Sequence, residues 1–266
     1  MKKLIVLVCL LLGLTSVFAD DEFPYRVKYP GLTPISSVDL EKEYLNKNVV
    51  IVDVRSKIEY DVIHPIDAIH LPVSDKLFTA DVQAILKGNK GKLIAFYCNG
   101  ITCLKSYEAA ERAMKETSYP GIRVYDAGIP DWSVKYPEKT LLLGEIIKNP
   151  KEQLISKEEL NKHMLTIEEF TAKSKEPNAF VVDARDFIQN SGSLPGFENS
   201  AKIPFDKLIP NIIEKKHHID KTLLIFDQVG KQVHWLMYYM VKNGYTNYYF
   251  LKGGATEVLK KQDYRK

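Results

Sequence analysis

The chain repeats one series of segments, and this internal repeat constrains the fold more than any other feature. Each copy has an apolar run ending in Asp-x-Arg, an apolar run ending at Cys or Asp, and a short apolar run followed by Gly. These three landmarks are residues 49–55 and 180–185, 92–98 and 222–227, and 124–128 and 249–254. Asp183 follows Asp53 by 130 residues, and Asp227 follows Cys98 by 129 residues. Because the spacing is nearly constant, the sequence predicts a duplicated domain.

Each copy alternates predicted strands with predicted helices. Ser36 with Asp39 three residues later predicts a helix N-terminus, and the apolar helix predicted at 231–243 ends before Gly244. The strand runs lack polar alternation, which is typical of a parallel sheet covered on both faces. We therefore expect an α/β fold with two tandem domains, each an open, mainly parallel sheet with helices on both faces. In the first copy, strands are predicted at 49–54, 92–97 and 122–125, and helices at 79–86 and 104–116.

The first 19 residues have the layout of a secretory signal peptide. Lys2 and Lys3 precede an apolar stretch at 4–19, which ends in small or apolar residues before Asp20. A membrane anchor is the alternative, but these 16 residues fall short of the roughly 20 that span a bilayer. We expect signal cleavage, export to the periplasm or the medium, and no stable membrane insertion of the mature protein.

Charge and histidine spacing give no sign of nucleic-acid or metal binding. The 266-residue chain has a formal net charge of +3, and its lysines alternate with acidic residues. A nucleic-acid-binding protein would show a concentrated basic face. His217 and His218 are adjacent and lack the spacing of metal ligands on one face. No nucleic-acid partner, metal site or cofactor is therefore predicted.

Two cysteines lie beyond the predicted signal, and their positions indicate chemistry. Cys98 and Cys103 are five residues apart, so a bond between them would close too small a loop to stabilise a fold of this size. Cys98 directly follows a predicted strand, at the end of the sheet where open parallel sheets bind ligands. Backbone N–H groups of the next loop and helix N-terminus would attract an anion, lower the thiol pKa and favour a nucleophilic thiolate. The candidate active-site loop comprises Asn99, Gly100, Ile101, Thr102, Lys105 and Ser106.

These motifs together resemble the rhodanese family of sulfurtransferases. The residues that carry the resemblance are Asp53-Val54-Arg55, Glu59-Tyr60, His64, Ala68-Ile69-His70-Leu71-Pro72, Tyr97-Cys98, Gly128 and Trp132. The resemblance covers most of residues 31–140 and returns more weakly over 164–262. It implies rhodanese-like domains at 31–144 and 163–266. The charged segment 145–162 has few large apolar residues and is predicted to be the linker between them. The resemblance also implies that Asp53 and Arg55 support the fold and the rim of the site.

The loop after Cys98 departs from the usual family pattern. Rhodaneses have Gly three residues after the cysteine and often Arg five after it, whereas this chain has Gly100 and Cys103. The segment resembles a rhodanese-like subgroup with a second cysteine in the loop. Related phosphatases and arsenate reductases use Cys-x5-Arg to bind an oxyanion. Leu104 occupies the arginine position, so phosphate-ester hydrolysis is not expected.

In the second copy, Asp227 replaces the cysteine. A carboxylate cannot carry a transferable sulfur, so we expect this domain to be inactive and either structural or a cover for the first site. We also expect that Asp227→Cys does not readily create a second active site, because a loop without a nucleophile need not direct its amides inward. His234 and Trp235 in the following helix are interpreted as a packed pair.

The resemblance implies that Cys98 forms a persulfide. A small sulfur-containing donor would supply the sulfur, and a thiol, sulfite, cyanide or protein acceptor would remove it. Cys103 is a candidate resolving cysteine that would attack the persulfide, release sulfide and leave a disulfide. The alternative is a non-catalytic binding or thiol-redox-sensing protein that uses Cys98 and Cys103. A disulfide needs Cα atoms within about 4.4–6.8 Å, so we expect Gly100 to allow a compact loop, with Cys98 the deeper cysteine.

Overall fold

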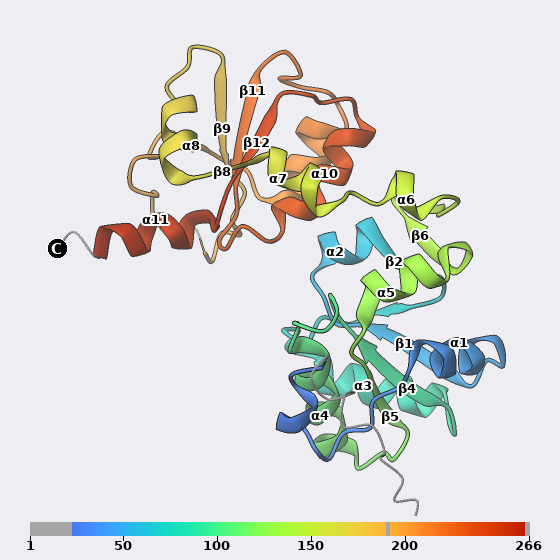
Figure 1. Cartoon of the computed structure of the whole chain (residues 1–266). Coiled ribbons are helices and arrows are strands. Elements are labelled where there is room, and N and C mark those ends of the chain that lie inside the picture. Colours follow the sequence, from blue (N-terminus) through green and yellow to red (C-terminus); the bar gives the residue numbers. More distant parts are fainter. Residues whose placement is uncertain (1–22, 190–191, 264–266) are drawn as a thin grey trace, which may run out of the picture.

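Two parallel sheets form the centres of the two halves of the chain (Figure 1). The computed structural model describes residues 23–189 and 192–263. The first sheet has the order β3-β1-β4-β5 and the second the order β10-β9-β11-β12-β8, with every neighbouring pair parallel. The strands are β1 (Val49–Asp53), β3 (Ile69–His70), β4 (Leu93–Tyr97), β5 (Ile122–Tyr125), β8 (Met164–Leu165), β9 (Ala179–Asp183), β10 (Ala201–Lys202), β11 (Thr222–Phe226) and β12 (Tyr248–Leu251).

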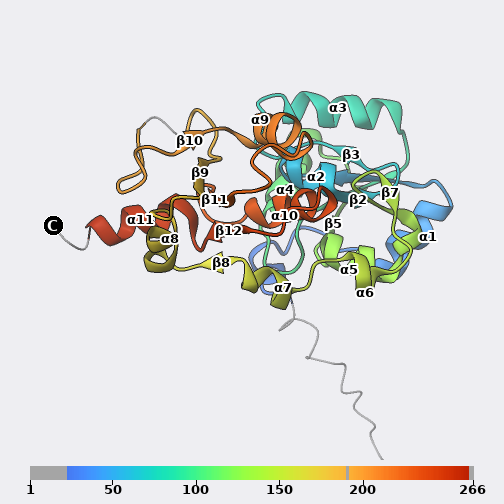
Figure 2. The ribbon, with the colours of Figure 1, turned by 90° about the horizontal axis from the view of Figure 1, so that it is seen from above.

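Helices cover both faces of the first sheet (Figure 2). Successive strand residues point to opposite faces, so Val50 and Val52 pack in one core cluster with α3 and α4, whereas Ile51 packs in another with α1, α2 and α5. The helices are α1 (Ser37–Leu45), α2 (Lys57–Val62), α3 (Phe78–Gly88), α4 (Lys105–Thr117) and α5 (Gly128–Lys135), with the short 3₁₀ helices η2 (Arg26–Lys28) and η3 (Pro137–Lys139).

The second sheet is enclosed in the same way. Leu223 and Ile225 pack with α9 and α10, while Leu224 and Phe226 pack with α8 and α11. The helices are α8 (Ile167–Lys173), α9 (Phe205–Leu208), the π-helix η4 (Ile209–Ile213), α10 (Val233–Lys242) and α11 (Gly254–Asp263). The tandem α/β fold with helices on both faces of each sheet is therefore confirmed.

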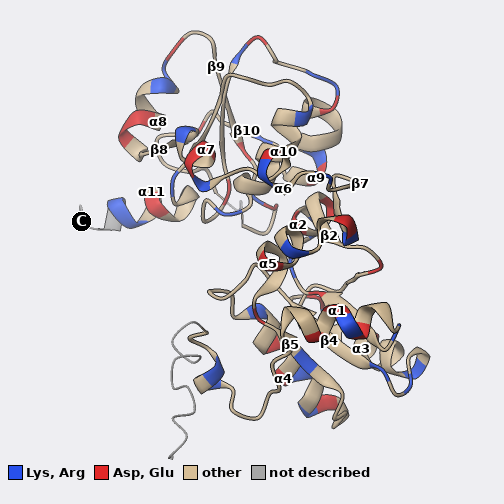
Figure 3. Cartoon of the chain, turned by 45° about the vertical axis from the view of Figure 1, so that its right-hand side comes forward, with Lys and Arg blue, Asp and Glu red and all other residues tan. Residues whose placement is uncertain are grey.

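The two domains meet along α2 and α10. The core cluster on the inner faces of the two sheets is continuous, running from Trp132 in α5 to Met237 in α10. Residues 145–162 carry short elements of their own. Strand β7 (Glu145–Ile146) joins β2 (Ile63–Pro65) and β6 (Thr140–Leu142) in a small antiparallel sheet, and α6 (Pro150–Gln153) and α7 (Lys157–Lys162) follow. Basic and acidic residues alternate along several helices in Figure 3.

Local sequence signals predicted most element positions within two residues. Ser36 accepts a hydrogen bond from the backbone N–H of Asp39 at the start of α1, as the capping pattern predicts, and β5 spans the predicted residues. Helix α10 begins at Val233, two residues later than predicted, because Lys231 and Gln232 belong to the preceding loop. The predicted signal at 1–19 lies outside the described residues. Within the described ranges, none of the helices has both the length and the apolar character needed to cross a bilayer.

Gly128 marks a close approach of two backbone segments beyond the end of β5. Its φ of +64° lies in the left-handed region, and a Cβ there would overlap the Cys98 carbonyl oxygen and the Gly100 nitrogen. The N–H of Ile129 donates to the same carbonyl at 3.0 Å. Gly254 repeats this arrangement against Asp227 and Gly230 in the second domain. Glycine at these positions therefore lets α5 and α11 begin directly against the loop that follows the central strand.

Gly128→Ala should destabilise the protein more than Gly144→Ala. Gly144 also has positive φ, at +84°, but a methyl group at that position would have nothing within 4 Å. Both changes carry the left-handed backbone penalty of roughly 1–2 kcal/mol, and only Gly128→Ala adds overlap with backbone atoms. We expect an additional loss of about 2 kcal/mol, measured as the free energy of unfolding in urea. Equal losses for both variants would show that the contact with Cys98 does not constrain the loop.

Candidate active site

Cys98 lies at the carboxyl end of β4, and the residue is 1 % exposed. Cys103 is partly exposed and lies two residues before the start of α4. The two form a disulfide with a Cα–Cα distance of 6.2 Å. This distance lies within the range of about 4.4–6.8 Å that disulfides require. The predicted proximity of the cysteines and the greater depth of Cys98 are therefore present in the structure, whereas their chemical roles stay predictions.

The loop between the cysteines is a tight turn. Gly100 has a φ of +98°, and its carbonyl accepts a hydrogen bond from the N–H of Cys103 at 2.9 Å. Asn99, Thr102 and Lys105 line a cleft together with both cysteines. Gly100 and Ile101 border a separate groove beside α1 and α5, and Ser106 is buried at the start of α4. Asn99 and Thr102 line this groove as well as the cleft, so they lie between the two sides of the loop.

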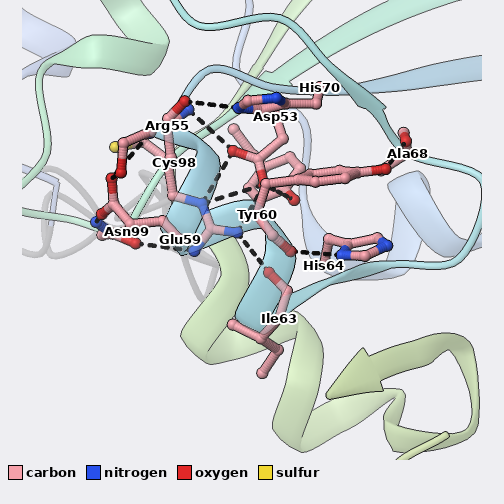
Figure 4. A network of polar contacts seen from close by, with 12 residues as sticks. Asp53, Arg55, Glu59, Tyr60, Ile63, His64, Ala68, His70, Cys98 and Asn99 are labelled. Carbon is pink, nitrogen blue, oxygen red and sulfur yellow. Dashed lines mark hydrogen bonds and ion pairs between the residues drawn. The ribbon is translucent and has the colours of Figure 1, made fainter. Parts of the chain in front are cut away.

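A buried ion pair holds this loop against β1 (Figure 4). Asp53 and Arg55 are fully buried, with the guanidinium Nη2 2.6 Å from Asp53 Oδ2. Nη2 also donates to the carbonyl of Ile63 at 2.6 Å, and Nη1 donates to Oδ1 of Asn99 at 3.1 Å. Burial alone lowers the Arg55 pKa, but the charge and hydrogen bonds of Asp53 and the charge of Glu59 outweigh it and raise that pKa overall. Arg55 therefore stays charged and fixes Asn99.

Glu59 holds the other side of Asn99. Its carboxylate accepts hydrogen bonds from the backbone N–H of Ser56 at 2.9 Å, from the Ser56 hydroxyl at 2.6 Å, and from the Asn99 side-chain amide. Burial raises the Glu59 pKa, but these hydrogen bonds and the charge of Arg55 outweigh burial and lower the pKa overall. Glu59 is therefore an ionised anchor for the loop and not a proton donor.

The Tyr60 ring stacks against two histidine rings beside these charged residues. The Tyr60 ring lies 3.9 Å from the His64 ring and 4.7 Å from the His70 ring, measured between centroids. Each histidine has a ring nitrogen against a backbone carbonyl, and the Tyr60 hydroxyl donates to Ala68 at 2.8 Å. Burial lowers the His64 pKa. Within the described part of the chain, no three His, Cys, Asp or Glu side chains gather as metal ligands would.

Both domains contribute to the cleft in front of the disulfide, which has a volume of about 440 Å³. The second domain supplies Lys231, His234 and Trp235 from the loop before α10 and its first turn. The Trp235 ring centroid lies 5.4 Å from the guanidinium carbon of Arg55, and burial lowers the His234 pKa. Sequence reasoning treated His234 and Trp235 as packing and did not single out Lys231. No local signal could have placed these residues beside a cysteine of the other domain.

The second domain has a cradle of backbone N–H groups at the position equivalent to the cysteine loop. The buried carboxylate of Asp227 accepts from the N–H groups of Val229 at 2.9 Å, Gly230, Gln232 at 2.5 Å and Val233 at 3.2 Å. The N–H groups of this loop do point inward, so the reason given for expecting no ready second active site from Asp227→Cys does not hold, whereas the effect of that change stays a prediction. They point inward because the Asp227 carboxylate is itself an anion around which the loop closes.

Comparison with known proteins agrees with this duplicated architecture. The family model of the Rhodanese-like domain matches residues 37–135 and 166–261. A search of curated proteins finds no match.

Similar solved structures include three proteins of low sequence identity. Thiosulfate sulfurtransferase from Pseudomonas aeruginosa is 19% identical, with a TM-score of 0.39, over 87% of this chain and 43% of that chain. As-Sb reductase from Leishmania major is 21% identical, with a TM-score of 0.37, over 49% of this chain and 97% of that chain. BH2092 protein from Bacillus halodurans is 19% identical, with a TM-score of 0.36, over 50% of this chain and 96% of that chain. Both halves of the chain match the family model, and the chain belongs to the rhodanese-like domain family as a tandem-domain member.

Proposed function

We propose that the protein is a sulfurtransferase that carries sulfane sulfur as a persulfide on Cys98. The observation that supports this most is the position of Cys98 at the end of β4, facing a cleft lined by both domains. The reduced Cys98 thiolate attacks the outer sulfur of a small donor, and the bond between that sulfur and the rest of the donor breaks. The remainder leaves with the electron pair, as sulfite does from thiosulfate. A thiol, sulfite or cyanide acceptor then takes the outer sulfur, and Cys98 leaves as a thiolate.

The surroundings of Cys98 favour a thiolate. Helix α4 has 13 residues and begins two residues after Cys103, and a helix N-terminus stabilises negative charge near it. The Asn99 side chain is fixed on both sides by Arg55 and Glu59, so the first loop residue does not have to be ordered when substrate binds. The helix N-terminus favours a thiolate at either cysteine, and the fixed Asn99, which directly follows Cys98, supports Cys98 as the sulfur-carrying residue.

Cys103 gives the site a second reaction. If the Cys103 thiolate attacks Cys98 Sγ of the persulfide, the bond to the outer sulfur breaks, hydrosulfide leaves and the Cys98–Cys103 disulfide forms. The structure holds this disulfide, which also favours the second candidate function, thiol-redox sensing. In that function, the cysteines alternate between dithiol and disulfide without carrying sulfur. For sulfur transfer, an acceptor must act before Cys103, or a reductant must reopen the disulfide.

We further propose that the protein acts after export. The predicted leader at residues 1–19 and the disulfide that Cys98 forms with Cys103 both suit an oxidising compartment. A periplasmic or secreted location can be tested by fractionating cells and sequencing the N-terminus of the recovered protein. Recovery of uncleaved protein in the cytosol would contradict export.

Cys98→Ser should abolish sulfur loading, whereas Cys103→Ser should retain it and lose the disulfide product. The reduced proteins are incubated with thiosulfate or a polysulfide, and their intact masses are measured. Loading appears as a gain of one sulfur atom, and disulfide formation as a loss of two hydrogens. The wild-type protein should show both masses, because Cys103 can resolve the persulfide.

The masses separate the two candidate functions and identify the nucleophilic cysteine. A wild-type protein that only loses two hydrogens, together with a Cys103→Ser variant that gains no sulfur, would contradict sulfur transfer and leave redox sensing. Loading that persists in Cys98→Ser would move the nucleophile to Cys103. Circular dichroism of each variant checks that the fold is retained.

Asp227→Cys in the Cys98→Ser, Cys103→Ser background tests the cradle of the second domain. The N–H groups that now hold the carboxylate would face a thiolate, so we expect its pKa to lie about 1 unit or more below the ordinary value of about 8.5. The measurement is the pH dependence of alkylation by iodoacetamide. An alkylation midpoint at or above 8.5 would show that the cradle depends on the carboxylate and does not persist around sulfur.

A further inference from the structure

The two sulfur atoms of the disulfide are not equally accessible from the cleft. Cys98 is 1 % exposed at the end of β4, whereas Cys103 is partly exposed, and both residues line the cleft. In thiol–disulfide exchange, an incoming thiolate attacks one sulfur and the other leaves. A thiolate that enters from the cleft therefore reaches Cys103, and the Cys98 sulfur is the leaving group.

The two cysteines also differ in their surroundings. Cys98 is a buried member of the apolar cluster between β4 and α4, whereas Cys103 is partly exposed at its border, two residues before α4. Accessibility therefore sets the direction of attack, in which the incoming thiolate bonds to Cys103 Sγ and frees the Cys98 thiolate.

The charges that line the cleft are of two kinds. The carboxylates of Glu59 and Asp227 are already held by hydrogen-bond donors of the protein. Lys105 of the first domain and Lys231 of the second are exposed on the cleft. In the part of the chain that the structure describes, neither lysine takes part in an ion pair. The cleft therefore offers a ligand two ammonium groups that no protein carboxylate occupies.

The volume of the cleft limits the size of the ligand that it can hold. Its volume of about 440 Å³ lies at the lower end of the roughly 300–1,000 Å³ typical of small-molecule sites. Trp235 supplies an apolar wall, and the disulfide forms part of the lining. These dimensions suit a small molecule whose thiol meets the disulfide while its acidic group lies between the lysines.

We propose that the cleft between the domains binds a small thiol bearing an anionic group, and that this thiol opens the disulfide by attacking Cys103. The thiolate forms a mixed disulfide with Cys103 Sγ, the Cys98–Cys103 bond breaks, and Cys98 Sγ leaves with the electron pair. A second molecule of the same thiol attacks the ligand sulfur of the mixed disulfide and releases the Cys103 thiolate. Two thiols are oxidised to one small disulfide, their two protons are released to solvent or taken up by the cysteines, and the protein is reduced to a dithiol.

This activity goes beyond sulfur transfer because it needs no sulfane sulfur donor. It gives the second domain a part in recognition, since Lys231 and Trp235 belong to that domain and the disulfide belongs to the first. It also supplies the step that returns the oxidised site to a state in which Cys98 is a free nucleophile.

Three thiols of matched length and different charge test the binding site. The oxidised full-length protein is mixed with 2-mercaptoethanesulfonate, 2-mercaptoethanol or cysteamine, and disulfide loss is followed by the appearance of alkylatable cysteines. Each rate is divided by the rate of the same thiol with a small uncharged disulfide, which removes differences in intrinsic reactivity. We expect the anionic thiol to exceed the neutral one by about threefold or more and the cationic thiol to be slowest, because two ammonium groups favour an anion.

Matched lysine variants test whether the preference for the anionic thiol arises in the cleft. Lys105→Gln with Lys231→Gln should reduce the ratio of anionic to neutral rates to about one, while Lys175→Gln, an exposed lysine after α8, should leave it unchanged. High salt should weaken the preference in the wild-type protein. Equal normalised rates for the three thiols, or a preference that survives the double change, would overturn the binding site.

Trapping the mixed disulfide tests the direction of attack. The reaction is stopped early with excess N-ethylmaleimide at mildly acidic pH, which alkylates the free thiols and ends the exchange, and the peptide masses are measured. We expect the mercaptoethanesulfonate adduct on Cys103 and the alkyl group on Cys98, and the reverse pattern would overturn the mechanism. Sulfur loading of protein reduced beforehand is measured separately, so failure of this inference and failure of the proposed sulfur transfer give different results.

Discussion

The buried ion pair between Asp53 and Arg55 joins the parts on which the site depends. Removing a guanidinium from water costs several kcal/mol unless its donors are matched, and here it donates to Asp53, to the carbonyl of Ile63 and to Asn99. One side chain therefore connects the end of β1, the end of α2 and the first residue of the cysteine loop. Its guanidinium also faces Trp235 of the second domain. Loss of either charge would leave its partner buried and uncompensated, a change that typically costs about 3–5 kcal/mol.

The second domain repeats the buried ion pair and the glycine contact of the first domain, but it has a different residue at the end of its central strand. Asp183 and Arg185 repeat the buried pair at 2.6 Å, and Gly254 repeats the close approach of a helix start to the loop. The difference lies at the end of the central strand, where the loop surrounds the carboxylate of Asp227 and not a sulfur. The backbone N–H groups of that loop therefore have a carboxylate of the chain itself as their acceptor.

Sequence patterns predicted what is local and missed what crosses between domains. Apolar strands and Gly positions indicated both sheets and placed Cys98 at a strand end, because periodicity and turn chemistry act over a few residues. Cys103 and the compact loop followed from spacing. Lys231 and Trp235 carry no such signal, since they meet the first site only through docking of α10 beside α2. The cradle around Asp227 was also missed, because replacement of a nucleophile indicates lost chemistry and does not reveal which donors the new side chain satisfies.

The filled cradle gives the second domain a positional role at the first site. Asp227 accepts hydrogen bonds from the N–H groups of Gln232 and Val233, the cap and first residue of α10. These bonds fix the start of a helix whose next two residues, His234 and Trp235, line the cleft in front of the disulfide. The Asp227 carboxylate therefore ties the end of β11 to the start of α10, and this link positions two residues of the second domain against the cysteines of the first.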